Sequence, residues 1–288
     1  MERIHRPVGL STCGKDITPA LFDAYRAAGI EMAEISTAAQ NYPVLPYRAI
    51  GKWAKDAGVT LWSFHLPFVP WEGYNIANLD LSLRRGILAL LGEYIKRAAD
   101  LGIPRIVIHP SGEPIAPLDR PRSMELAKEG LALLSRVAKE MGAHLCVEDL
   151  PRTCLGNCSA EILELLTADP SLTVCFDTNH LLGEPIADFV RAVGQKIETL
   201  HVSDYDFIDE RHWLPGEGKI DWRELLDLLD GVEYRGAFLY ELGFRAPRSV
   251  ARPRPLTCAD FARNAAELEA RAPLGVIGKA KDFGRCGK

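Results

Sequence analysis

Residues 172–180 read Leu-Thr-Val-Cys-Phe-Asp-Thr-Asn-His, and this stretch indicates how the whole chain is built. It begins with a short apolar and β-branched run, which favours a buried β-strand. It ends in acidic, amide and imidazole side chains, which are rarely buried without a polar or ionic partner. In both directions from this stretch, short apolar runs alternate with longer segments in which apolar residues recur every three or four positions. Such alternation predicts β-strands joined by amphipathic α-helices.

Eight strand-like runs are present, and they follow turn or helix-end signals such as Ala28-Gly29 or Leu101-Gly102. These runs are Pro7–Thr12, Glu31–Ser36, Thr60–Pro67, Arg105–Pro110, His144–Asp149, Leu172–Thr178, Thr199–Asp204 and Ala237–Leu242. The clearest helical segments between them are Leu83–Ala99, Ser123–Glu140 and Trp222–Leu229. Strands that each precede a helix form parallel sheets, and eight of them close into a barrel of about 250 residues. The sequence therefore predicts an α/β fold, a (β/α)8 TIM barrel.

The barrel is expected to be a single catalytic domain over residues 1–274, because no change in composition marks a linker. Residues 275–288 are rich in Gly and Lys, which predicts a flexible C-terminal tail. An open, doubly wound sheet is the structural alternative. That fold usually carries a G-x-G-x-x-G turn after its first strand, whereas residues 9–14 read Gly-Leu-Ser-Thr-Cys-Gly. The spacing therefore favours the barrel.

The composition of the chain narrows the function classes. Hydrophobic residues make up 47% and charged residues 25% of the chain, as is typical of a globular protein with a large core. The net charge of −5 and the scattered Lys and Arg residues do not favour nucleic acid as a partner. Seven cysteines, an odd number, favour a reducing cytoplasm over a disulfide framework. No apolar run reaches the roughly 18 residues of a membrane span, so we expect a cytoplasmic protein without a membrane partner.

Six of the eight predicted strands end in His, Asp or Glu. These residues are His65, His109, Glu148, Asp177 with the nearby His180, His201 and Glu241. In a TIM barrel the C-terminal ends of the strands meet at one mouth, where active sites lie. Buried acids and imidazoles that converge there need a compensating cation or a tight proton network. This set of ligand types favours one divalent metal ion, preferably Mn²⁺, with Mg²⁺, Co²⁺ and Zn²⁺ as alternatives.

These motifs resemble the xylose-isomerase-like TIM-barrel superfamily, which contains sugar isomerases and epimerases as well as endonuclease IV-type repair enzymes. The resemblance rests on F-D-T-N-H at residues 176–180, H-V-S-D at 201–204 and H-W-L-P-G-E-G-K-I-D-W at 212–222. In the sugar-active relatives a quartet of Glu, Asp, His and Glu binds the metal. The resemblance places this quartet on Glu148, Asp177, His201 and Glu241. It also implies that the two glutamates act as the acid and base catalysts.

The resemblance implies a metal-dependent sugar isomerase or epimerase that acts on a small polyhydroxylated substrate. One carboxylate would remove a proton beside a carbonyl while the metal stabilises the enediolate. Return of the proton to the opposite face gives epimerisation, return to the neighbouring carbon gives isomerisation, and loss of a β-hydroxyl gives dehydration. A dehydratase or lyase of a dehydroshikimate-like or oxidised-sugar substrate is therefore the alternative. A sugar-binding subunit without turnover is a third hypothesis.

Several histidines lie where endonuclease IV-type enzymes place additional zinc ligands. They are His65, His109, His180 and His212. Glu210 stands in place of the Asp that those enzymes use there. Sugar-active relatives often keep histidines at such places for substrate contacts, which is the role predicted here for all four, together with Arg211 and Trp71. The acidic net charge argues against the repair enzyme.

Two positions depart from the ketose 3-epimerases of this superfamily. Those enzymes place a Glu six residues after the first metal ligand, where this chain has Cys154, and an Arg six residues after the ligand histidine, where it has Phe207. The resemblance therefore implies the same metal quartet with different contacts to the substrate.

A long aromatic loop, residues 66–80, follows the third predicted strand. Its side chains Phe68, Trp71 and Tyr74 are suited to a lid that stacks on the apolar face of a sugar and excludes water. The same residues are equally suited to a packed loop or to a contact in a homo-oligomer. The sequence leaves these alternatives open.

Overall fold

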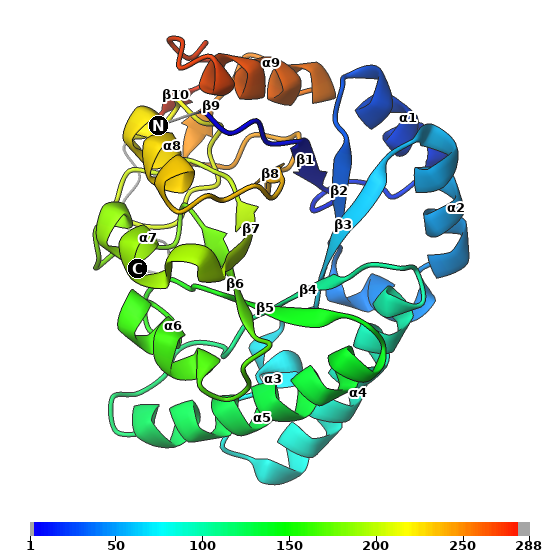
Figure 1. Cartoon of the computed structure of the whole chain (residues 1–288), viewed down its shortest axis with the longest axis vertical. Helices are drawn as coiled ribbons and strands as arrows, with labels where there is room; N and C mark the ends of the chain where they lie inside the picture. The colour runs from blue at the N-terminus through cyan, green and yellow to red at the C-terminus, as the bar shows by residue number, and fades with distance from the viewer. Residues whose placement is uncertain (1–2, 282–288) are drawn as a thin grey trace.

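The computed structural model describes residues 3–281. Eight parallel strands surround a central axis, and helices cover them on the outside (Figure 1). Their order is β7-β6-β5-β4-β3-β2-β1-β8, and a parallel bridge between Val202 and Tyr240 joins the two ends of the sheet. The backbone N–H of Val202 donates to the carbonyl of Leu239 across this join at 2.8 Å. The predicted (β/α)8 barrel is confirmed.

The strands lie where the apolar runs predict them. They are β1 (Val8–Ser11), β2 (Met32–Ile35), β3 (Thr60–His65), β4 (Arg105–Ile108), β5 (His144–Glu148), β6 (Thr173–Asp177), β7 (Ile197–His201) and β8 (Phe238–Tyr240). Only β7 begins before its predicted run, at Ile197 instead of Thr199, and it ends at His201. The predicted run extends to Asp204, but residues 202–204 belong to the loop that follows β7. They are as deeply buried as the strand itself.

One main helix follows each strand. These helices are α1 (Pro19–Ala27), α2 (Tyr47–Ala57), α4 (Leu81–Ala99), α5 (Arg120–Glu140), α6 (Ser159–Leu166), α7 (Ile186–Val193), α8 (Trp222–Gly231) and α9 (Cys258–Glu269). Side chains that accept hydrogen bonds from free backbone N–H groups mark several N-termini, with Thr18 before α1, Asp80 before α4 and Asp221 before α8. The short helix α3 (Trp71–Tyr74) lies within the aromatic loop that precedes α4.

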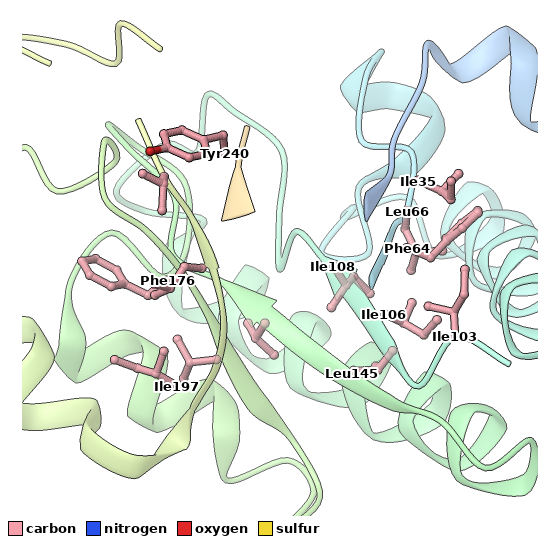
Figure 2. Packing of buried hydrophobic residues seen from close by; sticks show 14 of the residues in the cluster. Ile35, Phe64, Leu66, Ile103, Ile106, Ile108, Leu145, Phe176, Ile197 and Tyr240 are labelled. Carbon is pink, nitrogen blue, oxygen red and sulfur yellow. The ribbon is translucent and has the colours of Figure 1, made fainter. Parts of the chain in front are cut away.

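Alternate residues of each strand face two different environments. Phe64, Ile106, Ile108 and Leu145 belong to the layer between sheet and helices, and Figure 2 shows them within this packed cluster. The neighbouring positions point into the barrel because side chains alternate along a strand. A small separate cluster of Val107, Cys146 and Cys175 lies in the barrel interior. The interior positions one step further along β5, β6 and β7 carry the polar residues of the mouth.

The last described segment contacts the barrel. Strand β10 (Lys279–Ala280) pairs antiparallel with β9 (Val250–Ala251), and the backbone N–H of Gly278 donates to Glu217 at 2.7 Å. Residues 282–288 lie outside the described residues, so the flexibility of the predicted tail from residue 275 stays a prediction. Among residues 3–281, no helix is both long and apolar enough to cross a membrane.

Candidate active site

Four side chains predicted to bind a metal meet at the C-terminal mouth of the barrel. Glu148 ends β5, Asp177 ends β6, His201 ends β7 and Glu241 directly follows β8. One potential ligand atom from each lies within 4.8 Å of the others. His201 Nδ1 is 3.1 Å from Glu148 Oε1, 3.3 Å from Glu241 Oε2 and 4.0 Å from Asp177 Oδ2. The structure therefore brings the whole quartet together around one imidazole nitrogen.

The quartet carries more negative than positive charge in a buried place. Burial raises the pKa of Glu241, and the nearby His201 offsets this only in part. Burial also opposes ionisation of Glu148, yet His201 and His109 hold the pKa of its carboxyl well below the usual range. Two carboxyl groups in one site thus have pKa values that move in opposite directions, a pattern found where an acid and a base work together.

Asp177 is held so that one oxygen remains available. Its backbone N–H donates to Asp149 Oδ1 at 2.7 Å, and its Oδ1 accepts from the backbone N–H of Asn179 at 2.8 Å. Its second oxygen, Oδ2, is buried and has no hydrogen-bond partner among the described residues. An unpartnered buried carboxylate oxygen is costly, and a divalent cation among the three carboxylates would satisfy it. The donor set therefore fits the oxygen- and imidazole-binding ions named above.

Two of the predicted histidines flank Glu148. Nε2 of His65 and Nε2 of His109 lie 3.0 and 3.1 Å from Glu148 Oε2. Burial alone would lower the pKa of His65, but Glu148 raises it to about 9, whereas for His109 burial outweighs the same carboxylate and the pKa is lowered. The Phe68 ring stacks on His109 with centroids 4.2 Å apart. Both histidines thus lie beside the quartet, and their role as substrate contacts stays a prediction.

A second group lies beside Asp177. His180, Glu210 and His212 bring potential ligand atoms within 4.8 Å of one another. His180 Nε2 is 3.5 Å from Glu210 Oε2 and 3.6 Å from Asp177 Oδ2, so the group adjoins the quartet. Burial lowers the pKa of His180, but Asp177 and the other surrounding carboxylates raise it to about 9.

The loop after β7 is folded back to the mouth by two buried side chains. Asp204 accepts hydrogen bonds from the backbone of Tyr205, Gly216 and Ile220 and from the indole of Trp222. Asn179 Oδ1 accepts from the backbone N–H of Arg211 at 2.6 Å and of His212 at 3.3 Å. The motif at 212–222 therefore lies beside the motifs at 176–180 and 201–204, because Asn179 and Asp204 of those two motifs accept hydrogen bonds from it.

The two remaining predicted contacts have different surroundings. Arg211 is buried, its guanidinium donates to Asp206 Oδ2 at 2.9 Å, and its backbone N–H donates to Asn179 Oδ1. Trp71 lies on α3 with its ring centroid 6.1 Å from that of His109. The aromatic loop therefore covers the His109 side of the mouth, while Tyr74 packs against the hydrophobic core.

An ion-pair network borders the site next to a cavity. Arg152 pairs with Glu113, Asp209 and Glu210 at 2.6, 2.8 and 3.2 Å, which fixes Glu210 beside His180. A cavity of about 580 Å³ opens at this point, a size suited to a small ligand. Its lining residues are Arg152, Thr153, Asn157, Cys158, His180, Leu182 and Gly183.

The sequence pattern does not predict one buried acid that lies near the quartet. Glu34 on β2 is fully buried, and its Oε2 lies 3.0 Å from Nε2 of His201. It is followed by Ile35 within an apolar run, so it does not stand at a strand end as the other acids do. The sequence does contain one signal for it. An acid between Ala33 and Ile35 inside a short strand must have a buried partner, because burying an unpartnered charge costs too much free energy.

Comparisons with known proteins agree with this fold. A family model described as xylose isomerase-like TIM barrel matches residues 22–257. Fructoselysine 3-epimerase of Shigella flexneri is 32% identical over 135 residues, which are 43% of this chain and 48% of that protein, so the chain spans about half the length of this relative. D-psicose 3-epimerase of Agrobacterium fabrum is 25% identical over 225 residues, covering 74% of this chain and 75% of that protein.

Solved structures are similar over nearly the whole chain. A D-tagatose 3-epimerase-like protein superposes with a TM-score of 0.76 at 19% identity, covering 92% of this chain and 96% of the other. A 3-keto-D-glucoside 4-epimerase of Escherichia coli gives a TM-score of 0.73 at 17% identity, covering 92% and 100%. At these identities the similarity shows a shared fold.

Proposed function

The chain belongs to the xylose isomerase-like TIM barrel family, and from this premise we propose that it is a divalent-metal-dependent epimerase or isomerase of a small sugar or sugar-like substrate. The observation that carries the proposal is the convergence of three carboxylates and one imidazole within 4.8 Å at the mouth of the barrel. The names of the relatives, fructoselysine 3-epimerase and D-psicose 3-epimerase, support epimerisation of a ketose-type substrate.

In this proposal the quartet of Glu148, Asp177, His201 and Glu241 holds one divalent ion, with Mn²⁺ preferred. When bound, the ion stabilises negative charge that develops on substrate oxygens as a carbon-bound proton leaves. The free Oδ2 of Asp177 and the nearby Glu241 oxygen support such a site, because both are carboxylate oxygens facing Nδ1 of one histidine.

Glu148 and Glu241 are proposed as the proton-transfer pair. They come from β5 and from the end of β8, so they approach a substrate in the mouth from different directions. One accepts the proton from the substrate carbon and the other donates a proton to the opposite face, which inverts that carbon. The histidines and Glu210 are suited to hold hydroxyl groups, and Phe68 and Trp71 to exclude water.

The substrate contacts differ from those of the ketose 3-epimerases. Cys154 is buried, and Phe207 is exposed at a backbone φ of 63°. Neither side chain offers the charge that those enzymes place at these positions. We propose that His180, Glu210 and His212 take over these contacts. His180 lines the 580 Å³ cavity, and the other two residues lie beside it. A dehydratase or lyase with the same quartet remains the alternative.

Hydrogen exchange with the solvent tests the proposal. In D₂O with Mn²⁺, the protein is expected to place deuterium on one carbon beside the carbonyl of at least one ketose from a panel, because exchange at carbon requires a working base. Mass spectrometry and NMR identify the labelled carbon and so distinguish epimerase, isomerase and dehydratase products. If a ketose binds but no carbon-bound hydrogen exchanges, the protein is a binding subunit and the proposal is wrong.

A second candidate function, hydrolysis with several metal ions as in endonuclease IV-type enzymes, is favoured by one observation. His180, Glu210 and His212 form a second potential metal group beside the quartet. The net charge of −5 argues against a nucleic-acid substrate. The two functions make different demands on these histidines, because one uses them for the substrate and the other for a metal.

Alanine variants of His180 and His212 separate these functions. As substrate contacts, both variants are expected to keep the metal content of the wild type and to lose about 10- to 100-fold in kcat/KM, because a buried polar group of the substrate loses its hydrogen-bond partner. Elemental analysis and steady-state kinetics provide the measurements. His144→Ala is the matched control, since His144 begins β5 at the opposite end of the barrel. Loss of one metal ion per chain in either variant would support the multi-metal enzyme instead.

A further inference from the structure

We propose that Glu34 is a positioning residue for the cation site, whose buried carboxylate orients the ring of His201 so that Nδ1 faces the other three ligands. The inference rests on the proposed metal-dependent function. It adds a residue that touches neither the cation nor the substrate but determines which imidazole nitrogen is offered to the cation.

Glu34 reaches His201 across the interior of the barrel. Its Oε2 lies 3.0 Å from His201 Nε2 and also accepts a hydrogen bond from Ser63 Oγ at 2.8 Å. His201 is on β7 and Glu34 on β2, with β1 and β8 between them in the sheet. The contact is therefore made through the barrel core, beneath the mouth, with both side chains fully buried.

An irregularity in strand pairing directs Glu34 to this place. Ala33 of β2 pairs with Leu61 of β3, but the next residue, Glu34, pairs with Ser63, so the register shifts at this point. Such a bulge re-aims the following side chain. Glu34 and Ser63 thereby stand side by side facing the interior, where the serine hydroxyl can donate to the carboxylate.

The two nitrogens of His201 have different surroundings. Nε2 faces Glu34, while Nδ1 faces Glu148, Glu241 and, further away, Asp177. A neutral imidazole has one N–H, and a carboxylate only accepts hydrogen bonds, so the contact with Glu34 places the hydrogen on Nε2. The lone pair is then on Nδ1, where a cation needs it. Carboxylates that orient a ligand histidine in this way usually change metal affinity 10- to 100-fold, roughly, when they are replaced.

The surroundings of Glu34 do not suit a residue that serves stability alone. Its Oε1 is buried and has no hydrogen-bond partner among residues 3–281. Burying a carboxylate with one oxygen unpaired costs free energy that an apolar residue at this strand position would avoid. The ring of His201 is also stacked with His65 at an interplanar angle of 14°, so its plane is held and only the choice of nitrogen is left to Glu34.

The test compares Glu34→Gln with the wild type by equilibrium dialysis against Mn²⁺ and by the visible spectrum of bound Co²⁺. Glutamine keeps the size of the side chain but removes its charge and its strict acceptor character. We expect the dissociation constant for Mn²⁺ to rise about 10- to 100-fold, with a changed Co²⁺ spectrum. The urea midpoint of the metal-free protein is expected to change little. Ser63→Ala is expected to weaken binding in the same direction by a smaller factor.

Glu198→Gln provides the matched control. Glu198 lies on the same strand as His201, at the opposite end of the barrel, and its carboxylate contacts Arg105 and His144. This variant is expected to bind Mn²⁺ as tightly as the wild type. If the wild type binds neither Mn²⁺ nor Co²⁺, the proposed function fails together with this inference. If the wild type binds them and Glu34→Gln binds with equal affinity and spectrum, only the role of Glu34 is overturned. Should Glu34→Gln not fold, an unchanged dissociation constant in Ser63→Ala overturns it.

Discussion

Protein stripped of divalent cations by a chelator is expected to lose all measurable turnover and to regain it with about one equivalent of Mn²⁺ per chain. The reason is the group of Glu148, Asp177 and Glu241, three carboxylates that converge with His201 at the mouth. Without a cation, nothing in this group stabilises the negative charge that develops on the substrate oxygens when the carbon-bound proton leaves, so proton removal is expected to fail. Elemental analysis and rate measurements on the same samples provide the test.

Cation binding is also expected to stabilise the fold. Free Mn²⁺ at one hundred times its dissociation constant should raise the free energy of unfolding by about 2.7 kcal/mol, because it binds only the folded protein. Asp177→Asn and His201→Asn should each abolish this gain and sharply reduce the metal content. Full metal occupancy in both variants would remove these residues from the site, and turnover by fully stripped protein would contradict metal dependence altogether.

The strand-end pattern predicts the fold and the gathering of polar side chains at its mouth for a common reason. Side chains alternate along a strand, and the C-terminal ends of parallel barrel strands converge. A polar residue that closes an apolar run, as Asp177 closes Leu-Thr-Val-Cys-Phe, is therefore placed at the mouth by the fold itself. Glu148 and His201 follow the same rule on β5 and β7. Their spatial proximity requires no information beyond strand order.

Glu34 could not be predicted in the same way. It is not the last residue of its strand, and its neighbours Ala33 and Ile35 are ordinary core residues. Its contact with His201 depends on a register shift opposite Ser63 and on a reach across the barrel, which the sequence does not reveal. A side-chain contact across the barrel forms only when the sheet closes, so the pattern of apolar and polar residues along one strand does not predict it.

The same limit applies to the loops around the mouth. The sequence of the aromatic loop suits a lid and a packed loop equally. In the structure Phe68 stacks on His109 whereas Tyr74 packs against the core, and the lid stays a prediction. The motif at 212–222 is identified by resemblance, but apart from the Trp222 indole its attachment to Asn179 and Asp204 is made by backbone groups. Backbone donors carry no signature in the sequence, so these connections appear only in the folded chain.

Replacement of Glu241 by Gln is expected to lower turnover about 10²- to 10⁴-fold in protein saturated with Mn²⁺, the usual contribution of a positioned acid or base. Glutamine keeps one oxygen and nearly the same shape but cannot accept the proton. Because the change also weakens metal binding, rate and metal content must be measured together with excess Mn²⁺. Substrate binding is expected to change much less than turnover, so the loss should appear in kcat.

Isotope exchange then tests whether Glu241 and Glu148 serve opposite faces of the substrate carbon. In D₂O, Glu241→Gln should stop the interconversion of the two epimers while Glu148 still exchanges the hydrogen of one of them, and Glu148→Gln should exchange the hydrogen of the other. This complementary labelling requires two bases, because a single base that works on both faces would lose or keep both exchanges together. Glu198→Gln, at the far end of the barrel, should interconvert both epimers like the wild type. Metal-loaded Glu241→Gln with near wild-type turnover would exclude Glu241 from proton transfer and leave it as a ligand only.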